Sequence, residues 1–143
     1  RYNHPMADEY AKYLVKEYTY WSIYVAQNQG YLGRCVIWCK REDALDLAHA
    51  TADEQQELFK ALQELQTACS DLFKPDWFNY AFLGNETRHL HGHFIPRYKE
   101  AREFQGTNFT DTLFGKNYKT DATFITPDPI ILGVRDAYRH ALR

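Results

Sequence analysis

Three histidines at alternate positions are the residues of this chain that are best suited to chemistry. His89, His91 and His93 lie in the run RHLHGHFIPRY, and the whole chain has six histidines. Side chains two residues apart in a strand point to the same face. A strand here would therefore place three imidazoles in one row, with Leu90 and Phe94 on the opposite, core-facing side. Near neutral pH an imidazole can act as a base, an acid, a nucleophile or a metal ligand.

One use of such a row is nucleophilic attack on phosphorus. A neutral imidazole nitrogen can form a phosphoramidate intermediate, which water then hydrolyses readily. The other nitrogen of the attacking ring has to be protonated and held, usually by a carbonyl. The flanking imidazoles can donate hydrogen bonds to phosphate oxygens or protonate the leaving group. This chemistry requires no metal ion and no cofactor.

A metal site and a structural role are the alternatives. Two histidines separated by one residue on a strand share a face and can bind zinc together. The remaining ligand would come from His4 or His49, although neither lies in a recognisable companion motif. A structural role, with each imidazole hydrogen-bonded in a core or an interface, is common for single histidines but accounts poorly for three in one row.

The length and composition of the chain predict one soluble globular domain over residues 1–143. The formal net charge is −2 and no long basic run is present, which excludes a protein that coats a nucleic-acid polymer but not a small nucleotide ligand. No segment has the length of a transmembrane helix, so no membrane partner is expected. Three cysteines without a Cys-x-x-Cys pair favour a reducing compartment, and we expect a cytoplasmic protein.

A framework of strands and helices has to position the histidine row. The pattern predicts helices over 6–17, 52–73 and 129–143, strands over 20–26, 35–39, 77–83 and 88–95, and a long polar loop over 99–126 that could hold short strands. Thr51 and Glu54 form a capping box at the start of the middle helix. The turn at 84–87 is short, so the strands on either side should pair antiparallel. The predicted class is α+β, a mainly antiparallel sheet of about five strands with flanking helices.

At the histidine row the sequence resembles a known family. The run HLHGHFI at 89–95 is similar to the His-φ-His-φ-His-φ-φ signature of the histidine-triad (HIT) superfamily of nucleotide hydrolases and transferases. The PRY that follows is similar to its bacterial and diadenosine-polyphosphate-hydrolase-like branches. Residues 28–36 resemble the hairpin before the family's second strand, and residues 79–85 resemble the strand and turn before the triad. The resemblance covers residues 20–98 in the expected order and implies a HIT-like fold.

The resemblance implies roles for individual residues. His91 would be the nucleophile that attacks the α-phosphate and becomes nucleotidylated, while His89 and His93 would orient the ring and bind phosphate oxygens. Asn28 would match a side chain that binds the ribose hydroxyls, and Asn85 a polar phosphate contact. Ordinary turn chemistry is the alternative for both asparagines.

Other contacts follow from position. Arg97 ends the histidine strand and could neutralise the outer phosphates of a polyphosphate. The base would lie against apolar side chains of the hairpin at 20–37. Candidates for this contact are Ile23, Val25 and Ile37.

Three positions depart from the family pattern. Glu42 stands where many members have another histidine, and Arg88 where this branch often has proline or an apolar residue. Gly92 replaces a bulky apolar residue. Glycine inside a strand often marks a close approach by another segment of the chain. These departures put the substrate in question more than the reaction.

The resemblance thus implies a hydrolase that cleaves an α-phosphate bond of a nucleoside phosphate derivative through nucleotidyl-His91. The substrate would be a dinucleoside polyphosphate, a nucleoside phosphoramidate or an aminoacyl-adenylate-like compound, and we expect a purine nucleotide. No cofactor is implied, and the protein is expected to be a homodimer. Two other hypotheses stay open: a metal-dependent hydrolase with the histidine row as ligands, and a nucleotide-binding protein whose catalysis has decayed, motivated by Glu42 and Gly92.

Overall fold

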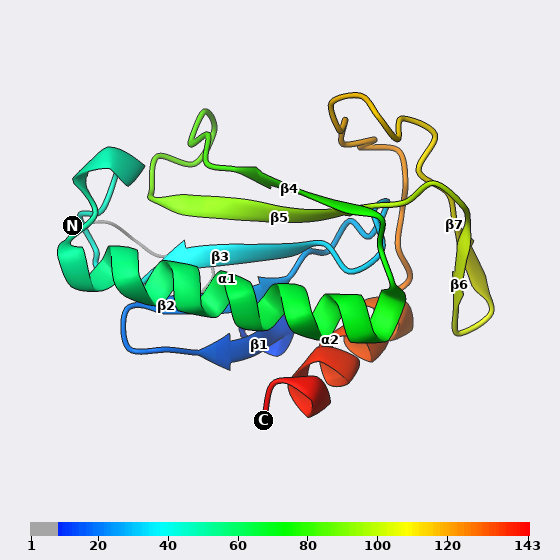
Figure 1. The fold of residues 1–143 in the computed structure, drawn as a ribbon, viewed down its shortest axis with the longest axis horizontal. Helices are drawn as coiled ribbons and strands as arrows, with labels where there is room; N and C mark the ends of the chain where they lie inside the picture. Colours follow the sequence, from blue (N-terminus) through cyan, green and yellow to red (C-terminus); the bar gives the residue numbers. More distant parts are fainter. Residues whose placement is uncertain (1–8) are drawn as a thin grey trace.

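A five-stranded antiparallel sheet runs through the centre of the computed structural model, which describes residues 9–143 (Figure 1). Its strands are β1 (Leu14–Glu17), β2 (Trp21–Val25), β3 (Cys35–Cys39), β4 (Trp77–Ala81) and β5 (His91–Arg97). They lie in the order β1-β2-β3-β5-β4, and all four pairings are antiparallel. The strand that carries His91 and His93 is therefore paired on both sides. This arrangement confirms the predicted α+β class.

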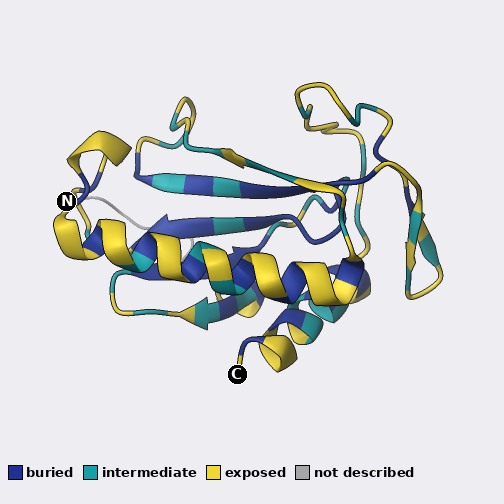
Figure 2. Cartoon of the chain, in the orientation of Figure 1, coloured by how far each residue is buried: buried dark blue, intermediate teal, exposed yellow. Residues whose placement is uncertain are grey.

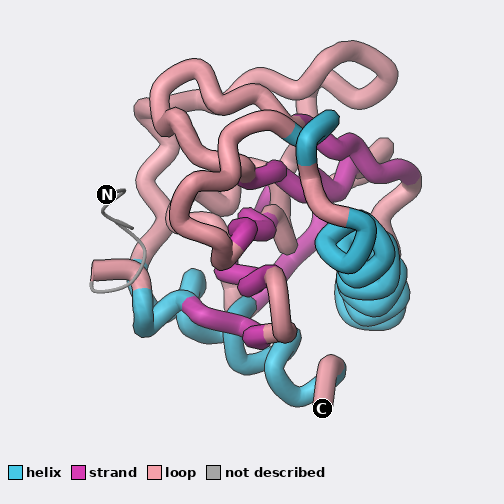
Figure 3. Tube along the Cα trace, turned by 90° about the vertical axis from the view of Figure 1, so that its left-hand side faces the viewer, coloured by secondary structure: helices cyan, strands magenta, loops and turns pink. Residues whose placement is uncertain are grey.

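The long helix α1 (Ala52–Phe73) lies against one face of the sheet, and its bounds confirm the prediction. It begins at the predicted capping box, in which Thr51 Oγ1 accepts from the Glu54 amide at 3.1 Å and Glu54 Oε1 accepts from the Thr51 amide at 2.8 Å. Viewed along the sheet, α1 lies to one side of the strands while loops gather on the other (Figure 3). The histidine row faces this loop side, because His93 contacts Arg34, which binds Thr120 of the polar loop.

The second helix, α2 (Asp128–Ala141), packs beside α1 and the first two strands. Its Tyr138 is fully buried, contacts the Phe73 ring edge-on and donates a hydrogen bond to the Gly33 carbonyl at 2.6 Å. Figure 2 shows that β3 and β5 are almost entirely buried, whereas α1 alternates between buried and exposed turns. The core therefore lies between the sheet and the two helices.

The predicted helix at 6–17 is wrong in its described part. Residues 6–8 lie outside the described residues, a short 3-10 helix covers Ala11–Tyr13, and the chain then forms β1. The apolar side chains of this segment could fit either a helix or a strand. The edge of β2 offers backbone partners to Leu14–Glu17, and this pairing outweighs the weak helix preference of so short a segment.

Two further segments differ clearly from their predicted bounds, while β2, β4 and α2 differ from theirs by one or two residues at an end. The histidine strand begins at His91 instead of residue 88, and it extends to Arg97. The predicted loop at 99–126 contains a small hairpin, β6 (Arg102–Phe104) and β7 (Thr107–Phe109), followed by an irregular segment over 110–126. Neither helix of the described part is long and apolar enough to cross a lipid bilayer.

Candidate active site

The site is built on an aromatic platform. Trp38 of β3 lies directly opposite His91 of β5 in the register of the sheet. Its indole stacks on the His89 ring, with centroids 4.2 Å apart, and more loosely on the His91 ring at 5.5 Å. Stacking of flat rings restricts their tilt, so Trp38 limits the orientations available to two of the three histidines.

The His91 ring has a defined tautomer. Its Nδ1 atom lies 2.6 Å from the main-chain carbonyl of His89. A carbonyl oxygen can only accept a hydrogen bond, so Nδ1 carries the proton and Nε2 of the neutral ring carries the lone pair. His91 thus has the form that the nucleophile hypothesis requires.

His89 is buried and hydrogen-bonded to the end of β3. Only 2% of it is exposed, and its Nε2–H donates to the Cys39 carbonyl at 2.6 Å. Burial lowers the pKa of the His89 ring, which favours its neutral form. The expectation that His89 binds phosphate oxygens does not fit this Nε2 bond. Its contribution to the site is instead its own carbonyl, which holds His91.

His93 is paired with an arginine that the sequence did not single out. The Nη2 atom of Arg34 lies 3.4 Å from Nδ1 of His93. A guanidinium can only donate, so Nδ1 is the acceptor and the proton of the neutral ring is on Nε2. Burial, the Arg34 charge and His91 lower the pKa of His93 to about 4. At neutral pH His93 therefore presents one N–H donor and no charge.

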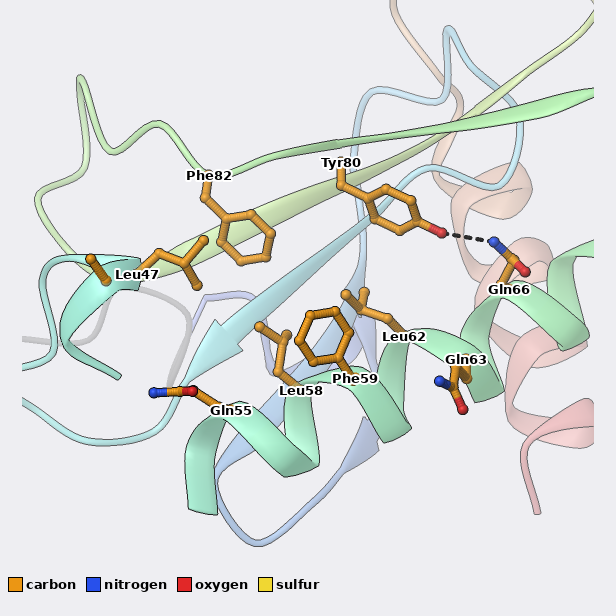
Figure 4. A pocket seen from close by; sticks show the side chains of 10 residues that line it. Leu47, Gln55, Leu58, Phe59, Leu62, Gln63, Gln66, Tyr80 and Phe82 are labelled. Atoms are coloured by element: carbon orange, nitrogen blue, oxygen red, sulfur yellow. Dashed lines mark hydrogen bonds between the residues drawn. The ribbon is translucent and has the colours of Figure 1, made fainter. Parts of the chain in front are cut away.

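A cavity of about 310 Å³ adjoins His89 and His91. The residues that line it besides these two are Leu45, Asp46, Leu47, Phe82, Leu83, Gly84, Arg88 and Leu90. Arg88 is exposed at this cavity, where its charge can meet an anionic ligand. A larger apolar groove of about 560 Å³ between α1 and β4 shares Leu47 and Phe82 with it (Figure 4).

Gly92 marks a close approach, as predicted. A Cβ atom at this position would overlap the Phe82 ring. Phe82 follows β4 and points toward α1, so it occupies the space that a side chain at position 92 would fill. The Phe82 ring therefore fills the space that the bulky apolar side chain expected at position 92 in relatives would occupy.

Arg97 does not reach the histidine row. Its guanidinium forms a buried ion pair with Asp111 at 2.8 and 3.1 Å. The remaining N–H groups donate at 2.8 Å to the side chain of Asn79 and to the carbonyls of Leu113 and Lys116. All five donors of the side chain are thus used within the protein. The expectation that Arg97 binds phosphate is wrong, because its place at the end of β5 is buried by the 110–126 segment.

The two asparagines lie in turns. Asn28 accepts from the Gly30 amide at 2.8 Å, which is ordinary turn chemistry, and donates to the Asp121 carbonyl of the 110–126 segment at 2.9 Å. Asn85 is exposed and follows Gly84, which lines the histidine cavity. Their roles toward ribose and phosphate stay predictions.

The apolar residues proposed for the base do not face the site. Ile23, Val25 and Ile37 are at most 2% exposed. Ile37 lies opposite Gly92, so its side chain is on the α1 face of the sheet, away from the imidazoles. These residues belong to the core, and the prediction that they contact the base is wrong.

The most important residues that sequence reasoning missed are Arg34 and Trp38. A signal was available, because Arg34, Val36 and Trp38 alternate along β3 and its approach. Val36 and Trp38 pair with His93 and His91. The alternation places all three on the histidine face, but only once the register of β3 against β5 is known.

The metal candidates outside the row do not join it. His4 lies outside the described residues, and His49 is exposed in a short 3-10 helix over Leu47–His49. Within residues 9–143, no three His, Cys, Asp or Glu side chains are arranged to hold a metal ion. In the histidine row, the His89 and His91 rings are each hydrogen-bonded to a main-chain carbonyl.

Solved structures and curated relatives resemble this chain. A histidine triad protein from Bradyrhizobium japonicum has a TM-score of 0.71 at 17% identity, covering 95% of this chain and 96% of its own. A hypothetical histidine triad nucleotide-binding protein from Sulfolobus tokodaii has a TM-score of 0.66 at 20% identity, covering 91% and 83%. At these identities the likeness shows a shared fold.

Sequence similarity extends to a yeast protein. A bis(5'-adenosyl)-triphosphatase of Saccharomyces cerevisiae is 36% identical over 72 residues, which are 47% of this chain and 35% of the relative. The chain thus matches about a third of that relative's length. The family model of the HIT domain matches residues 12–100 and includes β3, β5 and the whole histidine row. The chain belongs to the HIT domain family.

Proposed function

We propose that this protein hydrolyses an α-phosphate bond of a nucleotide through a nucleotidyl-His91 intermediate. The observation that carries the proposal is the 2.6 Å hydrogen bond from His91 Nδ1 to the His89 carbonyl. It leaves the lone pair on Nε2, the atom that would attack phosphorus. A structural histidine would need no such arrangement beside a cavity with an exposed arginine at its edge.

The reaction divides into two displacements. His91 Nε2 attacks the α-phosphorus, the P–N bond forms, and the bond to the leaving phosphate oxygen breaks. The phosphate leaves as an anion, which needs no proton at neutral pH, and the His93 Nε2–H can stabilise charge on the phosphate oxygens. Water then attacks the phosphorus, the P–N bond breaks with its electron pair returning to His91 Nε2, and the nucleoside monophosphate is released together with one water-derived proton to the solvent. The proton stays on His91 Nδ1 throughout, hydrogen-bonded to the His89 carbonyl.

A dinucleoside polyphosphate is the substrate class that we favour. The yeast relative is named as a bis(5'-adenosyl)-triphosphatase, and the match to it, although limited to a third of its length, supports a purine dinucleotide. A nucleoside phosphoramidate is the second candidate, since a nitrogen leaving group would need a proton that His93 could relay.

Trapping the intermediate tests the mechanism. The protein is mixed with diadenosine triphosphate, quenched in base after milliseconds and digested for mass spectrometry. We expect an acid-labile, base-stable adenylyl group on His91. His91→Asn should abolish the label and reduce kcat at least a thousandfold, while His140→Asn, an exposed histidine of α2, serves as the control.

Other results would contradict this mechanism. Label on another residue, or wild-type turnover in His91→Asn, excludes His91 as the nucleophile. Activity that is lost with EDTA and restored with stoichiometric zinc supports the metal-dependent alternative. Tight adenosine monophosphate binding without any label or turnover on diadenosine triphosphate and adenosine phosphoramidate supports a decayed nucleotide-binding protein.

We also propose that the protein forms a homodimer through the β4 edge and the groove beside it. β4 ends the sheet order, so its outer edge is unpaired among the described strands. In the adjoining groove, Phe59 of α1 is 64% exposed and Tyr80 of β4 is 42% exposed (Figure 4). Exposed aromatic residues beside an open sheet edge support an interface between two copies.

A further inference from the structure

We propose that Arg34 is a positioning residue that fixes the tautomer of His93, and that the 110–126 segment holds Arg34 in place through Thr120. The inference deepens the proposed function, because it explains how a donor beside the nucleophile is prepared. It rests on hydrogen bonds between the segment, the arginine and the imidazole.

Arg34 is a buried cation between two parts of the chain. It is 6% exposed, and its Nη1 atom donates to Thr120 Oγ1 at 2.8 Å, while Nη2 lies 3.4 Å from His93 Nδ1. The guanidinium carbon lies 5.3 Å from the centre of the Tyr118 ring. One side of the guanidinium therefore contacts the 110–126 segment, and the other contacts the histidine row.

No carboxylate of the described residues pairs with Arg34, although buried arginines usually have one. A carboxylate next to His93 would accept a hydrogen bond from the ring N–H and would favour the charged imidazolium. Arg34 has the opposite effect, because it can only donate. It therefore requires a lone pair on Nδ1 and leaves the ring proton on Nε2, the nitrogen that can face a phosphate.

The segment that holds Arg34 is itself anchored to the sheet. Tyr31 packs edge-on against Tyr118 at 6.3 Å, and its hydroxyl accepts from the Lys119 amide at 2.9 Å. Arg97 lies 5.1 Å from the Tyr31 ring. The buried pair of Arg97 with Asp111 thus anchors the start of a segment whose Thr120 reaches Arg34. This connection links the end of the sheet to the donor beside the nucleophile.

The test reads the tautomer of His93 directly. Long-range ¹⁵N–¹H spectra of uniformly labelled protein report which ring nitrogen is protonated between pH 5 and 8. We expect the Nε2–H form of His93 in the wild type and in Arg34→Lys, which keeps a donor. Arg34→Met should give a mixture of tautomers and a higher apparent pKa of His93. Thr120→Val, which keeps the side-chain volume, should move the spectrum in the same direction to a smaller extent.

Kinetics provide the second readout. Arg34→Met should reduce kcat by about 10- to 100-fold, while KM changes little. The loss should not exceed that caused by removing a transition-state hydrogen-bond donor altogether, because the His93 ring is still present. Arg34→Lys should recover most of this loss. Arg102→Met is the matched control, because Arg102 is a half-buried arginine that binds main-chain carbonyls away from the histidines. It should leave both the spectrum and kcat unchanged.

Several outcomes would overturn the inference. An unchanged His93 tautomer in folded Arg34→Met excludes the positioning role, and an Nδ1–H form in the wild type does the same. If Arg34→Met does not fold, an unchanged His93 spectrum and an unchanged kcat in Thr120→Val are the contradicting result. The spectra do not depend on turnover. A failed trapping experiment with the expected tautomers would therefore reject the proposed reaction and leave this inference standing.

Discussion

Each imidazole of the row uses one ring nitrogen for a contact that fixes its orientation. His89 donates to the Cys39 carbonyl, His91 donates to the His89 carbonyl, and His93 accepts from Arg34. Two of the three partners are main-chain carbonyls, and the third is the side chain of Arg34. The residue types therefore supply the chemistry, and the partners decide which nitrogen remains for it.

The low pKa of His93 predicts a stability change with pH. The folded value of about 4 lies below the ordinary value near 6.5, so the unfolded chain binds the proton first as the pH falls. Stability should thus decrease between pH 6.5 and 4, by about 2 kcal/mol after allowance for partial exposure of the ring. His93→Gln should remove this part of the decrease in urea denaturation series.

Glu54 should contribute a second decrease in stability, at lower pH than that of His93. The ion pair with Arg41 lowers the pKa of Glu54 to about 2, so its contribution is lost only as the pH falls below about 4.5. The decrease in the free energy of unfolding below pH 4.5 should be the same in the wild type and in His93→Gln. His140→Gln is the control at an exposed position. An equal decrease between pH 6.5 and 4 in wild type and His93→Gln would contradict the assignment.

At the scale of elements, the packing of β5 explains its glycine. β5 lies between β3 and β4, and the segment after β4 returns the Phe82 ring over Gly92. A side chain at position 92 and an aromatic ring at position 82 exclude each other. The histidine strand is therefore supported on its core-facing side by a residue that is far from it in the sequence.

Gly92→Ala should destabilise the protein by about 1–3 kcal/mol in free energy of unfolding, because the new methyl group overlaps the Phe82 ring. In a Phe82→Ala background the same change should cost at least about 1 kcal/mol less. Gly133→Ala is the control, since its methyl group meets only the end of the exposed Gln105 side chain. Equal costs of Gly92→Ala in both backgrounds would show that the ring does not occupy this space.

At the scale of the whole molecule, the two faces of the sheet have different tasks. The α1 face contains the core and the open groove, while the opposite face carries the imidazoles and the 110–126 segment. The site and the proposed interface are neighbours, because Leu47 and Phe82 line both the histidine cavity and the groove. A dimer formed through the proposed interface would therefore contact two residues that also line the histidine cavity.

The proposed homodimer predicts a change in mass on mutation of the groove. Phe59→Glu places a charge in the exposed apolar surface and should convert dimers to monomers in sedimentation equilibrium at micromolar concentration. Ile125→Glu is the matched control, because Ile125 is 80% exposed in the 110–126 segment, away from the groove. A wild type that is monomeric at all concentrations, or a dimer that persists in Phe59→Glu, would contradict this interface.

Most of the framework could be predicted from local pattern. The capping box and apolar stripe identified α1, the β-branched and aromatic runs identified β2 and β3, and the alternation of three histidines indicated the candidate site. The helix predicted over 6–17 is wrong in its described part, because the apolar pattern fits a helix or a strand and pairing of Leu14–Glu17 with β2 selects the strand. Such pairing partners lie outside any local window of sequence.

The sequence alone determined the chemical groups, the α+β class and the family resemblance, since these depend on residue types and short spacings. Only the tertiary structure decided which buried arginine lies beside the histidine row. Arg97 is adjacent to the histidines in sequence but is turned into a buried pair with Asp111, whereas Arg34, which directly precedes β3, lies against His93. The reason is physical: a strand alternates its side chains between faces, but register, burial and the chain that covers its end decide what each side chain meets.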